Sequence, residues 1–216
     1  MIAAVVNHAP GSGKTALAVH LAGELALRGR RVLLADAGLE AGSLRWAEAR
    51  RRTGHAALFE TVGLDRELIA AGRLRRALAG LSDGADPVIV DTPPRPFDRL
   101  SEVLAACDLV LLPVPAGGVA LSGSRAAIAA ALWERRRRPD LAVRVVYTRV
   151  RGAIPGAVLA MVNGARLVGT AAALCDEPVL SGVLPAGLLV HEAARGGPAV
   201  TCLSAITTEL FGRGGG

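Results

Sequence analysis

The sequence contains few cysteines, few aromatic side chains and one lysine. Its three cysteines, Cys107, Cys175 and Cys202, are far apart and form no C-x-x-C pair. Such spacing argues against a disulfide framework or a cysteine metal cluster, and it is typical of a reducing cytoplasm. The four histidines also lack the spacing of metal ligands, and we expect them in loops or at the surface: His8, His20, His55 and His191.

Long apolar runs are missing as well. Glycine, proline or a charged residue interrupts each run well before the roughly 18 residues that a membrane-spanning helix needs. The N-terminal segment has no basic stretch ahead of an apolar one, so we expect no secretory signal. Residues Thr201–Phe211 hold no lysine or arginine, although an amphipathic membrane anchor normally needs a cationic face. We therefore expect no attachment to a membrane.

Small apolar residues are abundant. Hydrophobic residues make up 51% of the chain and aromatic residues only 3%, a composition that suits helices packed closely on a buried sheet. A chain of 216 residues can build one α/β domain with a substantial core, but it is short for two. We expect a single domain over residues 1–211 and a flexible glycine-rich tail over 212–216.

Short apolar runs alternate with longer amphipathic segments along the chain. The apolar runs predict strands at residues 2–7, 31–35, 87–90, 109–114 and 142–147, with less regular candidates at 57–62 and 179–184. Helical spacing predicts helices at 15–28, 43–52 (with Ser43 as N-cap), 65–81, 97–106, 120–138, 155–163, 188–195 and 201–211. This alternation indicates an α/β fold with a doubly wound, mostly parallel sheet and helices on both faces.

The first predicted strand and helix are joined by a glycine-rich segment, Ala9-Pro10-Gly11-Ser12-Gly13-Lys14-Thr15. At such a junction, backbone N–H groups and the positive end of a helix dipole converge on an anion. The Lys14 ammonium can reach the β- and γ-phosphates of a nucleotide, and the Thr15 hydroxyl can ligate Mg²⁺. Because every other basic side chain is arginine, the one lysine indicates a need for a compact charge. We predict a phosphate site at Pro10, Gly11, Ser12, Gly13, Lys14, Thr15 and Ala16.

Further motifs lie before and after this loop. Asn7 precedes it, and Asp91-Thr92-Pro93-Pro94 follows a later strand. The other notable segments are Arg30–Ala37, Gly42-Ser43-Leu44 with Trp46, Asp108–Val114 and Val183–Pro198. Together they resemble the ParA/MinD group of deviant Walker P-loop ATPases, and they are most similar to small ParA partition proteins. The resemblance covers most of the chain and implies the same doubly wound fold.

The resemblance also implies a binding site for ATP or ADP with Mg²⁺, and the hydrolysis of ATP. Lys14, Asp36 and Asp91 would be catalytic, and Thr15 would hold the magnesium ion together with the two aspartates. By the same resemblance, residues 148–149 and 184–185 would lie beside the adenine. The predicted nucleotide site therefore gains Arg149 and Pro185.

Proteins of this group form homodimers on ATP, and a partner protein stimulates their hydrolysis. The resemblance implies that this chain is cytoplasmic and associated with the nucleoid, where it would position or partition DNA or a protein cargo. It also implies nonspecific DNA and a ParB-like or cargo-adaptor protein as partners. The net charge of +6 is compatible with DNA, and the residues that the resemblance favours for DNA contact are Arg149, Arg151, Arg166 and Arg195.

The chain departs from the pattern of this group at two places. The group's loop begins K-G-G, and its first lysine reaches the phosphates of the partner subunit, whereas this chain has Ala9 and Pro10. The group also carries D-x-D-P-Q after the second strand, and its second aspartate helps to position the attacking water. Here that position is Gly38, and Glu40 stands at the position of the glutamine. Since phosphoryl transfer depends on positioning and charge compensation, these changes should slow hydrolysis more than they weaken binding.

Two alternatives therefore stay open beside a working partition ATPase. One is a nucleotide-dependent switch or scaffold with impaired hydrolysis, which regulates a partner ParA-like protein. The other is a biosynthetic P-loop enzyme of the amidoligase or dethiobiotin synthetase type, for which the second half of the chain offers few polar residues.

Overall fold

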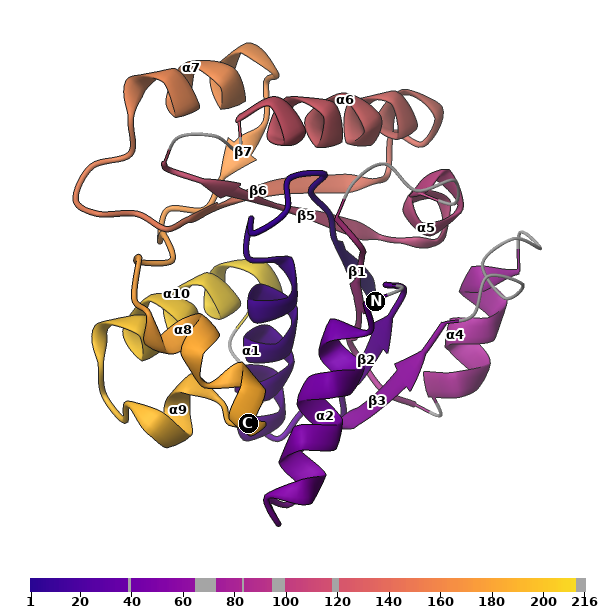
Figure 1. Ribbon diagram of the computed structural model, residues 1–216. Helices are drawn as coiled ribbons and strands as arrows, with labels where there is room; N and C mark the ends of the chain where they lie inside the picture. Colours follow the sequence, from indigo (N-terminus) through magenta and orange to yellow (C-terminus); the bar gives the residue numbers. More distant parts are fainter. Residues whose placement is uncertain (39, 65–72, 83, 95–99, 118–120, 213–216) are drawn as a thin grey trace.

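The computed structural model describes residues 1–38, 40–64, 73–82, 84–94, 100–117 and 121–212 (Figure 1). At its centre is a seven-stranded parallel sheet with the strand order β3-β2-β4-β1-β5-β6-β7. The strands are β1 (Ile2–Val5), β2 (Leu33–Asp36), β3 (Glu60–Gly63), β4 (Val88–Asp91), β5 (Leu109–Pro115), β6 (Ala142–Thr148) and β7 (Val168–Gly169). The predicted doubly wound, mostly parallel sheet is confirmed.

Helices cover both faces of the sheet (Figure 1). One layer consists of α1 (Lys14–Leu27), α2 (Gly42–Arg52), α8 (Val179–Gly182), the 3₁₀ turn η2 (Leu184–Ala186), α9 (Val190–Ala193) and α10 (Pro198–Phe211). The opposite layer consists of α4 (Leu74–Ser82), α5 (Leu100–Ala106), α6 (Leu121–Arg137) and α7 (Gly156–Gly164).

The central strand β1 shows why both faces need cover. Ile2, Ala4 and Val6 pack in the core beneath α4, α5, α6 and α7. Ala3 and Val5, which point the other way, pack beneath α1 and α10. All five side chains are buried, so the strand is apolar on both faces, as a parallel strand between two helix layers must be.

The connections of β1 and β4 create the place for a ligand. These two strands are neighbours, but β1 leads into α1 in one layer whereas the helix after β4 is α5, in the opposite layer. Neighbouring strands whose helices diverge in this way leave a crevice at their carboxyl ends, and ligands of doubly wound proteins bind there. The glycine-rich loop follows β1 and Asp91 ends β4, so both lie at this crevice.

Several predicted elements differ from the observed ones. Residues 179–184 were expected as a strand but form α8 and the start of η2. Pro185 lies in the first turn of η2, a position that proline favours, and Leu180 packs on the α1 side of the core. The helix expected at 188–195 is only the single turn α9, since the residue before it, Leu189, is extended. The two-residue strand β7 was not predicted at all.

Ser43 was predicted to be the N-cap of α2, and this prediction is wrong. The helix begins at Gly42 with Ala41 as its N-cap residue, and Ser43 lies inside the first turn. Part of the helix expected at 65–81, the start of the helices expected at 97–106 and 120–138, and the tail 213–216 fall outside the described residues. None of the helices in the described ranges combines the length and the apolar character needed to cross a bilayer.

Candidate nucleotide-binding site

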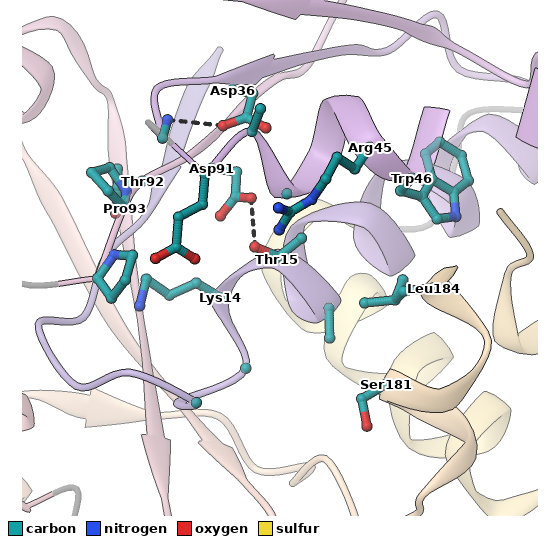
Figure 2. Close-up of a pocket in the computed structure, with 18 of the residues that line it drawn as sticks. Lys14, Thr15, Asp36, Arg45, Trp46, Asp91, Thr92, Pro93, Ser181 and Leu184 are labelled. Carbon is teal, nitrogen blue, oxygen red and sulfur yellow. Dashed lines mark hydrogen bonds between the residues drawn. The ribbon is translucent and has the colours of Figure 1, made fainter. Parts of the chain in front are cut away.

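A cleft of about 680 Å³ opens where the glycine-rich loop meets α2 and residues 181–185 (Figure 2). Every residue predicted to bind nucleotide or magnesium lines this cleft: Pro10, Gly11, Ser12, Gly13, Lys14, Thr15, Ala16, Asp36, Asp91, Arg149 and Pro185. These residues come from widely separated parts of the sequence, so it is the fold that brings them together.

The loop forms a cradle of backbone groups. Gly11 and Gly13 have φ angles of +67° and +91°, which residues with a side chain rarely adopt. The Lys14 Nζ donates to the carbonyl oxygen of Ala9 at 3.2 Å and to Ser12 Oγ at 3.4 Å, so the ammonium lies back over its own loop. Burial lowers the pKa of Lys14, although nearby carboxylates oppose this effect. A cation held over such a cradle is suited to a phosphate.

Asn7 fixes the start of the loop. Its side-chain nitrogen donates to the carbonyl oxygen of Pro113 at 2.7 Å and to Ser124 Oγ at 2.9 Å, and its oxygen accepts from the Ala9 N–H at 2.7 Å. Ala9 is only 5% exposed and lies against α6, where a Cβ on Gly123 would come within 2.6 Å of the Ala9 nitrogen. Position 9, where the resemblance expects a lysine, is therefore packed inside the subunit.

The carboxylate of Asp91 lies beside the glycine-rich loop, at the end of β4. Its Oδ2 accepts from Thr15 Oγ1 and from Ser43 Oγ, both at 2.8 Å. Its Oδ1 is buried and has no hydrogen-bond partner among the described residues. Burial and the nearby Asp36 raise the pKa of Asp91 to about 6. A buried anionic oxygen beside the Thr15 hydroxyl fits a magnesium ion with its waters, because Mg²⁺ prefers hard oxygen ligands and keeps part of its hydration shell.

Asp36 organises the segment that leads into α2. Its Oδ1 accepts from the Gly38 N–H at 2.8 Å. Its Oδ2 accepts from the N–H groups of Ser43 and Leu44 at 2.8 and 3.1 Å. Asp36 thus accepts hydrogen bonds from N–H groups at the start of α2 that have no partner within the helix. The side chain of the N-cap residue usually has this role, whereas Asp36 lies earlier in the sequence. The Ser43 hydroxyl is left to bind Asp91.

The far end of the cleft has residues suited to a base. Thr148 Oγ1 donates to the carbonyl oxygen of Ser12 at 3.2 Å, which places the next residue, Arg149, beside the glycine-rich loop. Ser181, Leu184 and Pro185 also line the cleft and form what we call its base-side wall. The mixture of apolar and polar side chains is typical of small-molecule pockets, and it is consistent with the adenine position that the resemblance implies.

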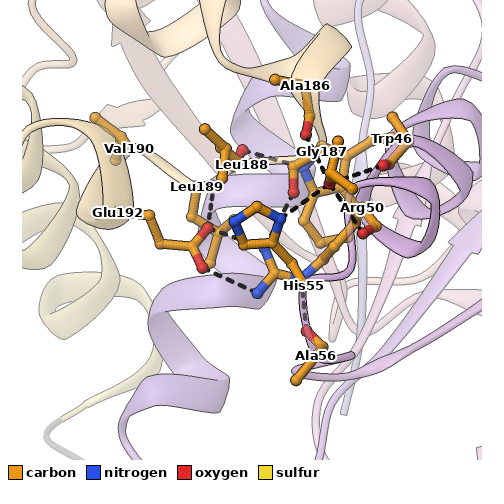
Figure 3. Close-up of polar contacts among 12 residues, drawn as sticks. Trp46, Arg50, His55, Ala56, Ala186, Gly187, Leu188, Leu189, Val190 and Glu192 are labelled. Atoms are coloured by element: carbon orange, nitrogen blue, oxygen red, sulfur yellow. Dashed lines mark hydrogen bonds and ion pairs between the residues drawn. The ribbon is translucent and has the colours of Figure 1, made fainter.

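Buried contacts join α2 to this wall (Figure 3). The Arg50 guanidinium binds both oxygens of Glu192 at 2.9 Å and donates to the carbonyl oxygens of Ala56 and Gly187 at 2.7 and 3.0 Å. It also lies 5.7 Å from the ring centroid of Trp46, whose Nε1 donates to the carbonyl oxygen of Leu188 at 3.1 Å. The magnesium side and the base side of the cleft are therefore tied together through one helix.

Sequence reasoning did not foresee the roles of Ser43 and Arg50, and it did not consider Arg45, which also lines the cleft. Ser43 and Arg50 bind partners that are distant in sequence, so no local pattern reveals these contacts. Within the described residues, no group of three or more His, Cys, Asp or Glu side chains is arranged to hold a metal ion by itself. A magnesium ion here would depend on phosphate oxygens as well as on the protein.

The four arginines predicted to contact DNA do not gather at one place. Arg149 lines the cleft, and Arg151 pairs with Asp176 at 2.6 Å. Arg166 lies between α7 and β7, whereas Arg195 follows α9 in the opposite helix layer (Figure 1). Their role in binding DNA stays a prediction.

The expectation that the histidines lie in loops or at the surface is wrong for His20. This side chain is 1% exposed within α1, and its Nε2 lies 2.7 Å from the carbonyl oxygen of Leu180 in α8. His191 is also largely covered and pairs with Glu24 of α1. Both histidines join α1 to the segment that bears the base-side wall of the cleft.

Comparison with known proteins agrees with this fold. The chain is 39% identical over 115 residues to the maintenance of carboxysome distribution protein A of Gloeobacter kilaueensis, a match that spans 53% of this chain and 49% of that protein. It is 29% identical over 153 residues to an uncharacterized protein of Pseudomonas putida, over 56% of this chain and 58% of that protein. The chain thus spans only about half the length of the curated relatives it matches.

Solved structures resemble the chain over nearly its whole length. The structure of apo McdA from Cyanothece superposes with a TM-score of 0.76 at 18% identity, over 96% of this chain and 98% of that one. MinD of Aquifex aeolicus, in complex with MinC, superposes with a TM-score of 0.77 at 17% identity, over 98% and 96% of the two chains. Residues 3–196 match the CbiA family, described as the CobQ/CobB/MinD/ParA nucleotide binding domain. The chain belongs to this family of nucleotide-binding proteins.

Proposed function

We propose that this protein binds ATP with Mg²⁺ in the cleft, dimerises in the ATP-bound state, and positions or partitions DNA or a protein cargo on nonspecific DNA. The observation that carries the nucleotide part is Oδ1 of Asp91, which lies beside Thr15 and the glycine-rich loop and has no partner in the described part of the chain. The positioning part is supported by the relative of Gloeobacter kilaueensis, whose name assigns it to carboxysome distribution.

Each group of the cleft has a role in this proposal. The loop N–H groups and the Lys14 ammonium bind the phosphates, Thr15 and Asp91 hold the magnesium ion, and Asp36 keeps the start of α2 in place beside them. The magnesium ion would neutralise charge that develops on the phosphates during transfer. Arg149 and Pro185 would flank the base.

The proposed dimer binds DNA without regard to its sequence. A net charge of +6 favours contact with phosphates, and binding of this kind weakens steeply with salt. A ParB-like or cargo-adaptor protein would stimulate turnover, and the protein would then act in the cytoplasm on the nucleoid.

A second candidate is a nucleotide-dependent switch or scaffold with impaired hydrolysis, which regulates a partner ParA-like protein. The burial of Ala9 against α6 favours it, since this position offers no cation to a partner subunit. Gly38 favours it as well, because glycine has no carboxylate to position an attacking water.

Nucleotide binding and ATP turnover by the purified protein, with and without nonspecific DNA, test the proposal. Binding together with DNA-stimulated turnover supports the positioning ATPase. Binding without turnover, lost in Lys14→Ala, supports the switch. Turnover that appears only with a small carboxylic acid substrate would instead indicate the biosynthetic alternative, and absence of nucleotide binding would contradict all three.

A further inference from the structure

Arg45 is a cation in the cleft to which no role has been assigned. It lies in the first turn of α2 and lines the cleft. Its guanidinium points from the helix toward Thr15 and Asp91 (Figure 2), the two residues that would hold the magnesium ion. A charge at this place faces the site of the terminal phosphates, not the base.

The helix that carries Arg45 is held firmly at this point. A Cβ on Gly42 would come within 3.0 Å of Thr15 Oγ1, so the start of α2 lies directly against the magnesium-binding residue. The N–H of Ser43 donates to Asp36 and the hydroxyl of Ser43 donates to Asp91. These contacts fix the backbone of Arg45 relative to the phosphate loop and leave only its side chain to move.

The guanidinium of Arg45 differs from those of its neighbours on α2 in its contacts. It makes no hydrogen bond or ion pair with any residue in the part of the chain that the structure describes, whereas two arginines of the same helix, Arg50 and Arg51, each bind a glutamate. Yet Arg45 is directed into the cleft and not away from the protein (Figure 2). Arg45 is exposed, so its guanidinium is accessible to a phosphate that enters the cleft.

The cleft also needs a further cation. Phosphoryl transfer requires that the charge on the terminal phosphate be compensated, and Ala9 offers no cation to either subunit. A guanidinium can bind two phosphate oxygens at once, with a geometry that an ammonium does not offer. We propose that Arg45 binds the terminal phosphate of ATP within its own subunit and supplies the charge missing at position 9. This inference rests on the proposed binding of ATP in the cleft.

The test compares ligands with and without the terminal phosphate. Calorimetric titrations with Mg²⁺ and either ADP or the imido analogue of ATP, which is not hydrolysed, would use wild type, Arg45→Ala and Arg45→Lys. Since a charged hydrogen bond is lost, Arg45→Ala should bind the ATP analogue about tenfold more weakly or worse, with less than a twofold change for ADP. Arg45→Lys should recover part of the loss.

A matched control lies on the same helix. Arg51→Ala removes the same charge from α2 but lies outside the cleft, so it should leave both affinities unchanged. Because Arg45 has no bond to a described residue, Arg45→Ala should also keep the thermal midpoint of the nucleotide-free protein. Equal weakening for ADP and the ATP analogue, or no weakening at all, would overturn the inference.

Binding measured at several protein concentrations shows whether Arg45 contacts the nucleotide of its own subunit or that of a partner subunit. The difference between the two ligands should persist at dilutions where light scattering shows only monomers. A difference that appears only in dimers would assign Arg45 to the partner's phosphate and overturn the proposal. Failure of wild type to bind either nucleotide would contradict the proposed function itself, which is a distinct result.

Discussion

Thr15 donates its hydroxyl proton to Oδ2 of Asp91 across 2.8 Å, and this contact joins the first residues of α1 to the end of β4. The other oxygen of Asp91 is buried without a partner among the described residues. An anion in this position destabilises the metal-free protein, since burial of an uncompensated charge is costly. The same anion is what a magnesium ion needs, so ligand binding and stability are opposed at this residue.

Asp91→Asn should therefore stabilise the protein without ligands at high pH. Because the folded pKa of Asp91 is about 6 and its ordinary value is 3.8, this carboxyl favours folding fully below pH 3.8 and loses that contribution as the pH rises through 6. The loss amounts to roughly 3 kcal/mol. Thermal unfolding in chelator should show a gap in midpoint between variant and wild type that opens from pH 4 to pH 8 in favour of the variant.

Two further results complete this prediction. Addition of Mg²⁺ and nucleotide should raise the midpoint of wild type much more than that of Asp91→Asn. Asp36→Asn is the matched control, because the Asp36 carboxylate accepts three backbone N–H bonds and its replacement should destabilise the protein. A gap for Asp91→Asn that stays constant with pH would contradict the expected role of its charge.

Gly123→Ala should displace the phosphate loop from the side of α6. The new Cβ would lie 2.6 Å from the Ala9 nitrogen, so the loop or α6 must shift, at a cost of about 1–3 kcal/mol. Circular dichroism should show a lower thermal midpoint, and nucleotide titration should show weaker binding. Gly80→Ala, in a helix with no atom within 4 Å of the new Cβ, should stabilise by up to about 1 kcal/mol. Unchanged nucleotide affinity in Gly123→Ala would show that the loop tolerates the shift.

Two adjacent arginines of α2 should differ sharply in their contribution to stability. The side chain of Arg50 is 5% exposed and binds Glu192, whereas that of Arg51 is 76% exposed and binds Glu48. Arg50→Ala leaves two carbonyl oxygens and the partly exposed Glu192 carboxylate without their donor, so urea unfolding should show a loss of about 1–3 kcal/mol. Arg51→Ala should leave the urea midpoint unchanged. Similar midpoints for the two variants would mean that Glu192 finds water in place of Arg50.

The parts of this fold that sequence patterns predicted are those with local causes. The glycines and Lys14 act within one loop, and the central strands are continuous apolar runs, so both could be recognised without knowledge of the fold. Residues 179–184 are also apolar, but their structure depends on packing against α1, which periodicity in a short run does not reveal.

The same distinction applies to the site. Asp36 and Asp91 end predicted strands, and parallel strands bring their carboxyl ends to one edge. The donors that complete the site are not local: Ser43 reaches Asp91 from 48 residues away, and Arg50 reaches Glu192 from 142 residues away. Ser43 satisfied every local criterion for an N-cap, and only the competing bond from Asp36 to the helix start explains why it has another role.

His20 should make the protein sensitive to mild acid. Burial lowers its pKa to about 4, and its Nδ1 faces the Val190 N–H at 3.5 Å, where a second proton would meet another donor. As the pH falls from 6.5 to 4, the unfolded chain takes up a proton that the folded protein refuses, which removes about 3 kcal/mol of stability. His20→Gln keeps a donor for the carbonyl oxygen of Leu180 but does not titrate, so urea unfolding of this variant should lose less stability over this range than wild type does. The control is His55→Gln, at an exposed histidine, whose stability should change with pH as that of wild type does. If the stability of His20→Gln also changed with pH as in wild type, another group would be responsible for the acid sensitivity.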